Sequence, residues 1–204
     1  MNAKAEILKA ADQLFAEVGF DAATTREIAE LSGVNKALIH YHFKSKEALF
    51  EALLDRYYQE LNQTLLQAMN RPGDIRERLF ALVDVYLDFL SANRNFSRMV
   101  QRESAGGKHL DRVVRNLTPM FKVGAEWIQA AYPQTADGDF SAVQLLVSFY
   151  GMIVSYFTYG GALGQLTGED VFSAEAIGRR RRHLHRMLEL TLSALDGGRK
   201  PEAE

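Results

Sequence analysis

The sequence predicts an all-α protein of about nine helices, with an N-terminal three-helix unit followed by a larger helical region. Apolar residues recur three and four positions apart along most of the chain, which is the pattern of amphipathic helices. Glycine and proline interrupt this spacing, and no segment alternates apolar and polar residues as a half-buried strand does. The 204 residues, 47% of them hydrophobic, allow one or two domains with a sizeable core.

The first helix is predicted over residues 3–18, where apolar residues recur at helical spacing: Ile7, Ala11, Leu14, Phe15 and Val18. Gly19 ends this helix, because glycine leaves the helical conformation without steric cost. We expect Phe20, which follows, to fill the small core of the N-terminal unit.

Two short helices joined by a tight turn are predicted next. Thr24 and Glu27 have the spacing of a capping box, in which each residue satisfies a free backbone N–H of the other. Gly33 can end the first helix in the left-handed region, and Asn35 can cap the second. The first helix is expected to turn three apolar residues inward: Ile28, Ala29 and Leu31. This arrangement predicts a helix-turn-helix, whose second helix is built to enter a DNA major groove.

These residues also resemble a known family. The run GVNKALIHYHFKSKE at 33–47, preceded by TTREIA at 24–29, is similar to the signature of TetR-type transcriptional regulators. The resemblance covers roughly residues 4–54, and beyond them only a helical outline is shared. His40 stands where such proteins usually have tyrosine, and Leu38 where a small polar residue is common, so both could alter which bases are read.

The resemblance implies a DNA-binding domain over residues 1–46 and a ligand-binding and dimerisation domain over residues 47–204. It implies a homodimer that binds a palindromic operator, most simply as a repressor that a small apolar or aromatic molecule releases. Two alternatives stay open: a structural DNA-binding protein of the same fold without an effector, and an enzyme that uses a C-terminal cavity. Against the enzyme, the sequence has no Ser/His/Asp grouping, paired carboxylates, P-loop or dinucleotide fingerprint, and we expect no cofactor.

The start of the predicted recognition helix carries the candidate base contacts. With Ile39 and Phe43 turned inward, Lys36, Ala37 and Leu38 face outward. Lys36 can donate to guanine O6 and N7, and Leu38 can touch a thymine methyl group. The alternative is an exposed helix start without a partner.

A second group of residues suits the DNA backbone. Hydroxyl groups, amides at helix N-termini and a lysine in a first helical turn are typical phosphate contacts. The expected phosphate contacts are Thr24, Thr25, Asn35, His40, Tyr41, His42 and Lys46, and Arg26 resembles a family position that reaches a base or a phosphate.

Charge supports this location without making the protein a polycation. The net charge is −2, and residues 1–50 hold six Lys/Arg against seven Asp/Glu. Residues 33–46, in contrast, contain three lysines and no acid, and this local imbalance matters more for DNA than overall charge does. The chain has no cysteine for a disulfide or a thiolate zinc site. A metal on His40 and His42 is disfavoured, because side chains two positions apart on a helix point to nearly opposite sides.

Further helices are predicted at residues 45–70, 75–91, 95–105, 108–131, 140–160 and 173–196. Ser45 is expected to cap the first of these, and residues 71–74 give the clearest turn signal. Pro119 interrupts the fourth: either one helix kinks there, or Thr118 caps a new helix with the proline in its first turn. We expect Gly197 and Gly198 to end the last helix and residues 200–204 to fray.

Residues 140–168 form a run of 29 without a charged side chain. That length raises a membrane span, but its glutamines, serines and glycines favour a buried helix that also packs on a partner. We therefore expect a dimer face built by residues 140–160 and 173–196, with Leu146 and Leu188 central. Arg179–Arg182 could form another DNA patch, although a solvated first turn is the simpler interpretation. The N-terminal residues lack a secretory pattern, so a cytoplasmic location is expected.

Aromatic and apolar residues of the middle helices could line an effector cavity, although such a pattern also describes an ordinary core. The candidates are Phe89, Phe96, Met99, Arg102, Phe121, Trp127, Tyr150 and Phe157, with Gln101 and Glu103 as further polar candidates.

Overall fold

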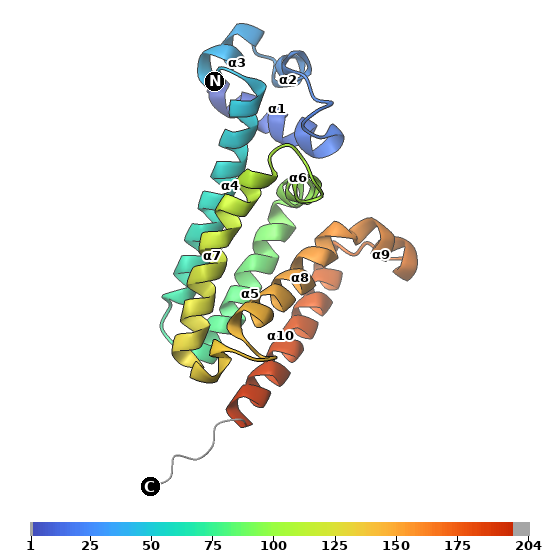
Figure 1. Ribbon diagram of the computed structural model, residues 1–204. Coiled ribbons are helices and arrows are strands. Elements are labelled where there is room, and N and C mark those ends of the chain that lie inside the picture. The colour runs from blue at the N-terminus through green and yellow to red at the C-terminus, as the bar shows by residue number, and fades with distance from the viewer. Residues whose placement is uncertain (1, 198–204) are drawn as a thin grey trace. The chain divides into compact units, whose positions relative to one another are not determined.

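The computed structural model describes residues 2–197, and within them the fold is all-α, as predicted (Figure 1). These residues form ten α-helices and one 3-10 turn, and no strand. The helices are α1 (Ala3–Val18), α2 (Thr25–Ser32), α3 (Lys36–Phe43), α4 (Lys46–Met69), α5 (Ile75–Ala92), α6 (Arg94–Ser104), α7 (Leu110–Ala131), α8 (Ala142–Thr158), α9 (Gly160–Thr167) and α10 (Ala174–Gly197), with the 3-10 turn at Pro133–Ala136.

The described residues divide into two compact units. The first comprises the residues up to Leu61 together with Asn93–Asn116, and the second comprises Asn62–Ala92 and the residues from Leu117 onward. The division does not follow the expected domain limit at residue 46. Instead, the first half of α4, all of α6 and the start of α7 belong with the helix-turn-helix.

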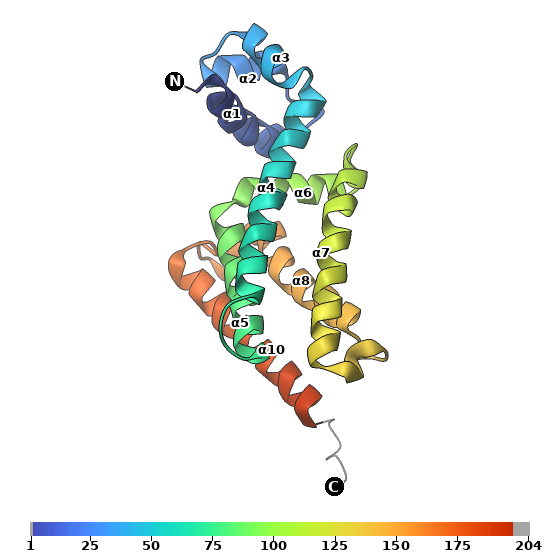
Figure 2. The same cartoon turned by 90° about the vertical axis from the view of Figure 1, so that its left-hand side faces the viewer.

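An aromatic cluster forms the core of the first unit, in which α1, α2 and α3 gather around the first half of α4 (Figure 2). Phe20 is 5% exposed and packs against Phe15 and Phe50, at centroid distances of 5.9 and 5.1 Å, so its predicted core role is confirmed. Two other predictions were wrong, because Val18 and Leu31 lie in the last turns of their helices and are 47% and 49% exposed.

Polar contacts attach α6 to α1 and α4 within this unit. The Asp12 carboxylate accepts hydrogen bonds from Tyr57 Oη at 2.6 Å and from Asn95 Nδ2 at 2.8 Å. Arg102 donates to the carbonyl oxygens of Phe15 and Glu17 at the end of α1, at 3.3 and 3.0 Å. Burial and the neighbouring carboxylate raise the pKa of Tyr57, so the hydroxyl keeps its proton and remains a donor.

The turn before α7, which belongs to the first unit, packs on the aromatic core of that unit. The His109 ring lies 4.4 Å from the Phe20 ring and 4.8 Å from the Phe50 ring, centroid to centroid. Within α7, Arg112 pairs with Asp55 and Glu51 of α4. Helices distant in the sequence therefore complete the core that α1–α4 begin.

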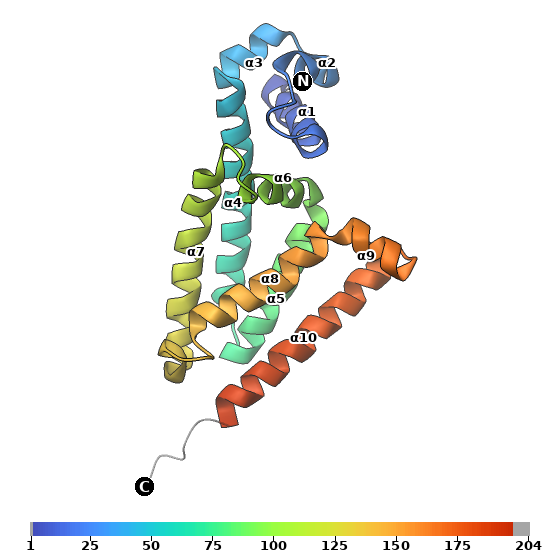
Figure 3. The same cartoon turned by 45° about the vertical axis from the view of Figure 1, so that its right-hand side comes forward.

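In the second unit, α5, α8 and α10 lie together, and α9 forms the corner between α8 and α10 (Figure 3). Arg181 of α10 pairs with Asp84 and Asp88 of α5, and His185 Nε2 lies 2.7 Å from Asp84 Oδ1. Arg180 donates to the carbonyl oxygen of Met152. Arg179 also pairs, with Glu169 and Glu175, so the interpretation of Arg179–Arg182 as simply solvated was wrong for three of the four residues.

Helix α7 runs through Pro119 as one helix from Leu110 to Ala131. The alternative in which Thr118 caps a new helix was therefore wrong. Proline has no N–H, so it cannot donate the backbone hydrogen bond expected at this position. The helix nevertheless continues through the proline without a break.

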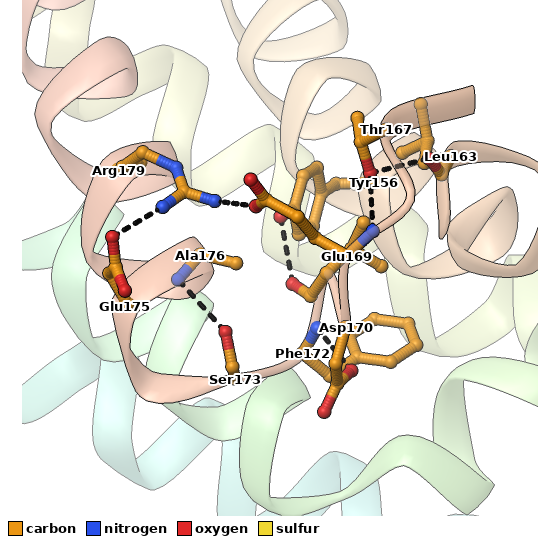
Figure 4. Close-up of polar contacts among 11 residues, drawn as sticks. Tyr156, Leu163, Thr167, Glu169, Asp170, Phe172, Ser173, Glu175, Ala176 and Arg179 are labelled. Carbon is orange, nitrogen blue, oxygen red and sulfur yellow. Dashed lines mark hydrogen bonds and ion pairs between the residues drawn. The ribbon is translucent and has the colours of Figure 1, made fainter. Parts of the chain in front are cut away.

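Helix α9 was not predicted, because its eight residues include three glycines. Gly160 is required at its start, since a Cβ there would collide with the Phe172 ring. Polar contacts fix the connection to α10 (Figure 4): Tyr156 Oη donates to the carbonyl oxygen of Val171, and Arg179 pairs with Glu169 and Glu175. Short helices rich in glycine depend on such contacts more than on intrinsic propensity.

Among residues 2–197, no single helix has the length and apolarity needed to cross a membrane. Helices α8 and α9 meet those criteria only as a pair, and they are bent by 71° where they join. The predicted fraying at residues 200–204 and the stop at Gly198 lie outside the described residues.

Candidate nucleic-acid interface and apolar cavity

Local hydrogen bonds build the turn between α2 and α3. Thr24 accepts from the N–H of Glu27 at 3.2 Å, and Glu27 Oε2 accepts from the N–H of Thr24 at 2.9 Å, which confirms the capping box. The Thr24 hydroxyl also donates to this carboxylate, and these bonds lower the pKa of Glu27. Gly33 ends α2 at φ +67°, and Asn35 Oδ1 accepts from the N–H of Ala37 at 2.9 Å. The caps thereby fix where α3 begins.

Helix α3 turns one face inward and leaves its start uncovered. Ile39 and Phe43 are 2% and 5% exposed, as the sequence predicts. All three residues at the start of α3 are exposed: Lys36, Ala37 and Leu38. The apolar Leu38 is 37% exposed. An exposed apolar side chain beside a lysine at a helix N-terminus suits the edge of a base pair.

A hollow of about 280 Å³ lies beside this face, lined by Thr25, Lys36, His40, Lys44 and Ser45. Within residues 2–197, two lysines and no carboxylate line it, so it favours an anion. Lys44 and Ser45 were missing from the predicted site. The cluster of lysines without acids was the feature of the sequence that could have identified this part of the site. The left-handed backbone of Lys44, at φ +67°, could not be predicted from the sequence.

Some of the predicted phosphate contacts already have partners within the protein. The Thr24 hydroxyl serves the capping box, and the exposed Arg26 pairs with Glu30 at 2.9 Å. Tyr41 is 70% exposed, and its ring packs edge-on against His42 at 5.1 Å. The exposed ion pair between Arg26 and Glu30 contributes little to stability, so Arg26 can turn to a DNA contact at small cost.

Lys46 is engaged more completely. Its Nζ donates to the carbonyl oxygens of Phe20 and Ala23 at 2.8 Å and lies 3.4 Å from that of Asp21. The ammonium group also lies 4.4 Å from the centre of the Phe20 ring. An ammonium has three donors, and all three point to the loop between α1 and α2. Lys46 therefore holds this loop, and a phosphate contact would have to replace these bonds.

An apolar cavity of about 350 Å³ lies within the second unit, lined by residues of α4, α5, α7, α8 and α10. Leu66 and Val123, 50% and 45% exposed, are among its lining residues. No charged side chain is among the lining residues that the structure describes. The polar ones are Asn62, Tyr86, Trp127, Tyr132, Tyr150 and Thr191.

Three of the eight predicted cavity residues line this space: Phe121, Trp127 and Tyr150. The Tyr150 ring stacks on Tyr86 at 6.2 Å and meets the edge of Phe121 at 5.2 Å. Burial raises the pKa of Tyr150, against a smaller opposite effect of its hydrogen bond with Tyr86. Tyr150 is therefore neutral at physiological pH.

The other five predicted cavity residues do not line it. Phe96, Met99 and Arg102 belong to α6 in the first unit, where Phe96 packs on the Tyr57 ring at 5.0 Å. Phe157 stacks on Phe172 at 5.8 Å, and Phe89 is buried elsewhere in α5. Of the further polar candidates, Gln101 and Glu103 also lie on α6, and Glu103 accepts from the N–H of His109.

The expected centres of the dimer face also need correction. Leu188 is 5% exposed within its own protomer, and Leu146 lines the cavity. The exposed apolar side chains of these helices are instead Val143 and Val147 on α8 and Leu190 on α10, exposed by 56%, 49% and 51%. For brevity we refer to these three exposed residues together as the outer α8–α10 face.

Comparison with known proteins supports the interpretation of the N-terminal unit. Residues 7–53 match the family model described as bacterial regulatory proteins, tetR family. The chain is 34% identical over 97 residues to the HTH-type transcriptional activator FasR of Mycolicibacterium smegmatis, covering 48% of this chain and 44% of that protein. It is 29% identical over 164 residues to an Escherichia coli protein, the tetracycline repressor class A from transposon 1721, covering 80% of this chain and 67% of the repressor.

Among solved structures, the ketosteroid transcriptional regulator KstR2 of Mycobacterium tuberculosis matches with a TM-score of 0.71 at 18% identity. The match covers 93% of this chain and 95% of that one, so the likeness in fold extends well beyond the N-terminal unit. In sequence, the chain spans about half the length of the first curated relatives it matches, 44%, 51% and 51%.

Proposed function

Because the chain belongs to the TetR family of bacterial regulatory proteins, we propose that it is a transcriptional repressor that binds a palindromic operator as a homodimer. We further propose that a small apolar molecule in the cavity of the second unit releases it from DNA. The observation that carries this proposal is the uncovered start of α3, where Lys36, Ala37 and Leu38 are exposed beside a cationic hollow.

The proposed roles at the interface follow from chemistry and exposure. Lys36 and Leu38 read base edges, and Ala37 permits close approach of the backbone. Phosphates meet the cationic hollow, which adds Lys44 to the expected set. Thr25, Asn35, His40, Tyr41 and His42 remain proposed phosphate contacts, and Arg26 remains a proposed base or phosphate contact.

The proposed dimer uses the outer α8–α10 face. A two-fold dimer of helix-turn-helix units places its recognition helices one DNA turn apart, about 34 Å, or a multiple of it. The exposed Val143, Val147 and Leu190 give this face apolar area to bury. Val147→Lys should yield a folded monomer in sedimentation, because its side chain is not part of the protomer core. A dimer that survives this change would move the interface elsewhere.

The effector role is supported by the cavity, whose volume of about 350 Å³ suits a small ligand. A ligand can shift the DNA-binding equilibrium only if it binds the two conformations with different affinity. Helix α4 carries both Lys46 and cavity residues such as Leu65, so we propose that it transmits the change.

Selection of bound duplexes from random DNA, read by sequencing, tests the proposal directly. We expect inverted repeats as the recovered sites. Lys36→Ala should then relax preference at one position per half-site by about 1–3 kcal/mol, the worth of a good bidentate contact. Lys9→Ala, an exposed lysine of α1 outside the interface, is the matched control. Recovery of unrelated sequences, or equal site preference in both variants, would reject specific DNA recognition by α3.

A further inference from the structure

The chemistry of the side chains that line the cavity restricts which ligands can bind there. Among the described residues, every side chain that lines it is uncharged, although aspartate, glutamate, lysine and arginine make up 25% of the whole chain. An ionised group moved from water into such a site loses its hydration and finds no opposite charge. The cavity therefore selects against ions by the absence of a counter-charge, and not only by its shape.

Two lining groups, the Asn62 amide and the Trp127 indole, leave their whole hydrogen-bonding capacity to a ligand. Within the described part of the chain, the Asn62 side-chain amide and the Trp127 indole N–H have no hydrogen-bond partner. The Thr191 hydroxyl donates to the carbonyl oxygen of Met187 at 2.9 Å, so only its acceptor capacity is left. Indole offers a donor and the amide offers both donor and acceptor, so an oxygen acceptor on a ligand would have a partner.

Three of the aromatic residues that line the cavity, Tyr86, Tyr150 and Phe121, do not form a cage for a cation. A cage for a quaternary ammonium needs several ring faces turned toward one point. Here Tyr86 and Tyr150 stack on each other, and Tyr150 meets Phe121 edge to face, so these rings face one another.

Resting on the proposed function, we propose that the effector is a neutral, mainly apolar molecule that carries a hydrogen-bond-accepting oxygen such as a carbonyl. A cavity with this lining excludes free carboxylates, phosphates and quaternary amines as the species bound. The apolar body fills the cavity, and the oxygen accepts from Trp127 Nε1–H or from the Asn62 amide.

Probes that share an apolar body and differ in the charge of the head group test this assignment. Isothermal titration of the full chain would compare decanamide, decanoate and decyltrimethylammonium at pH 7.5, and naphthalene-2-carboxamide with 2-naphthoate. We expect each amide to bind at least about a hundredfold more tightly than its charged counterparts, because the site cannot compensate a buried charge. Equal or tighter binding of a charged probe, or no binding of either amide, would overturn the proposal.

Two variants make the test specific to the residues named. Trp127→Phe keeps a ring but removes the N–H, and should weaken the amides about tenfold while leaving unsubstituted naphthalene unchanged. Asn62→Arg adds a cation to the cavity and should reverse the preference toward decanoate. An Asn62→Arg variant that still prefers decanamide would contradict the charge argument.

Operator binding in the same samples separates this inference from the proposed function. Amide binding without any change in operator affinity would leave the cavity chemistry standing and reject the effector role. Release from the operator by a charged probe would keep regulation and reject the neutral class.

Discussion

Lys46 gives a sharp test of how the interface is built. In the structure its ammonium group holds the loop between α1 and α2 through short hydrogen bonds to the carbonyl oxygens of Phe20 and Ala23. The sequence instead suggests a phosphate contact. The substitution Lys46→Met keeps the apolar stem and removes the donors, so it separates these roles.

The expected loss of stability follows from the contacts removed. A hydrogen bond to a charged group contributes about 1.5–3 kcal/mol, and the ammonium–ring contact about 0.5–1 kcal/mol at a partly exposed site. Because Lys46 is only half-buried, water can replace part of the two short bonds. We therefore expect the free energy of unfolding to fall by about 2–3 kcal/mol, which lowers the urea midpoint by roughly 1 M.

The assay is urea unfolding followed by operator binding at several salt concentrations. Lys44→Met is the matched control, because Lys44 is exposed at the end of α3 and lines the cationic hollow that is proposed to meet phosphate. That control should keep the wild-type midpoint while the slope of log affinity against log salt falls by about one. If Lys46→Met behaved like this control, the loop-holding role would be refuted and the phosphate role supported.

Three further changes test other parts of the fold. Bonding in the capping box lowers the folded pKa of Glu27, so its stabilisation should be full above pH 4.5 and disappear as pH falls through the folded value. The difference in melting temperature between wild type and Glu27→Gln should accordingly shrink in acid; a difference independent of pH would contradict this. Gly160→Ala should destabilise by about 1–3 kcal/mol through collision with Phe172, whereas Gly161→Ala, with open space at its Cβ, should be neutral or stabilising in the same denaturation assay. Asp84→Asn should cost about 1–2 kcal/mol in unfolding free energy, and an unchanged midpoint at low salt would show that its ion pairs contribute nothing.

Features set by residues close in the sequence were predictable. The capping box joins positions three apart, Gly33 needs only its own conformational freedom, and Asn35 caps a residue two positions on. The all-α fold and the orientation of Ile39 and Phe43 follow from apolar spacing in the same way.

Features that depend on a distant neighbour were not predictable from the same patterns. Phe96 and Trp127 are both aromatic residues on amphipathic helices, yet only Trp127 lines the cavity. Likewise, apolar spacing placed Leu188 on the apolar face of its helix. It could not show that this side chain is buried within its own protomer and not against a partner. The partners of Lys46 lie 23 to 26 positions away, so its sequence context indicated only a basic residue at a helix start.

Because α6 belongs to the first unit, it restricts how N-terminal segments can be exchanged between related proteins. A transplanted segment that ended at Leu61 would keep Asp12, Phe20 and Phe50 but lose Asn95, Arg102 and His109, which cover or bond to that segment. The recipient would have to supply matching side chains from its own helices. Exchange of DNA specificity between relatives is therefore simpler by replacing outward residues of α3 than by moving the whole N-terminal segment, and a working chimera would carry Asn93–Asn116 from the same donor.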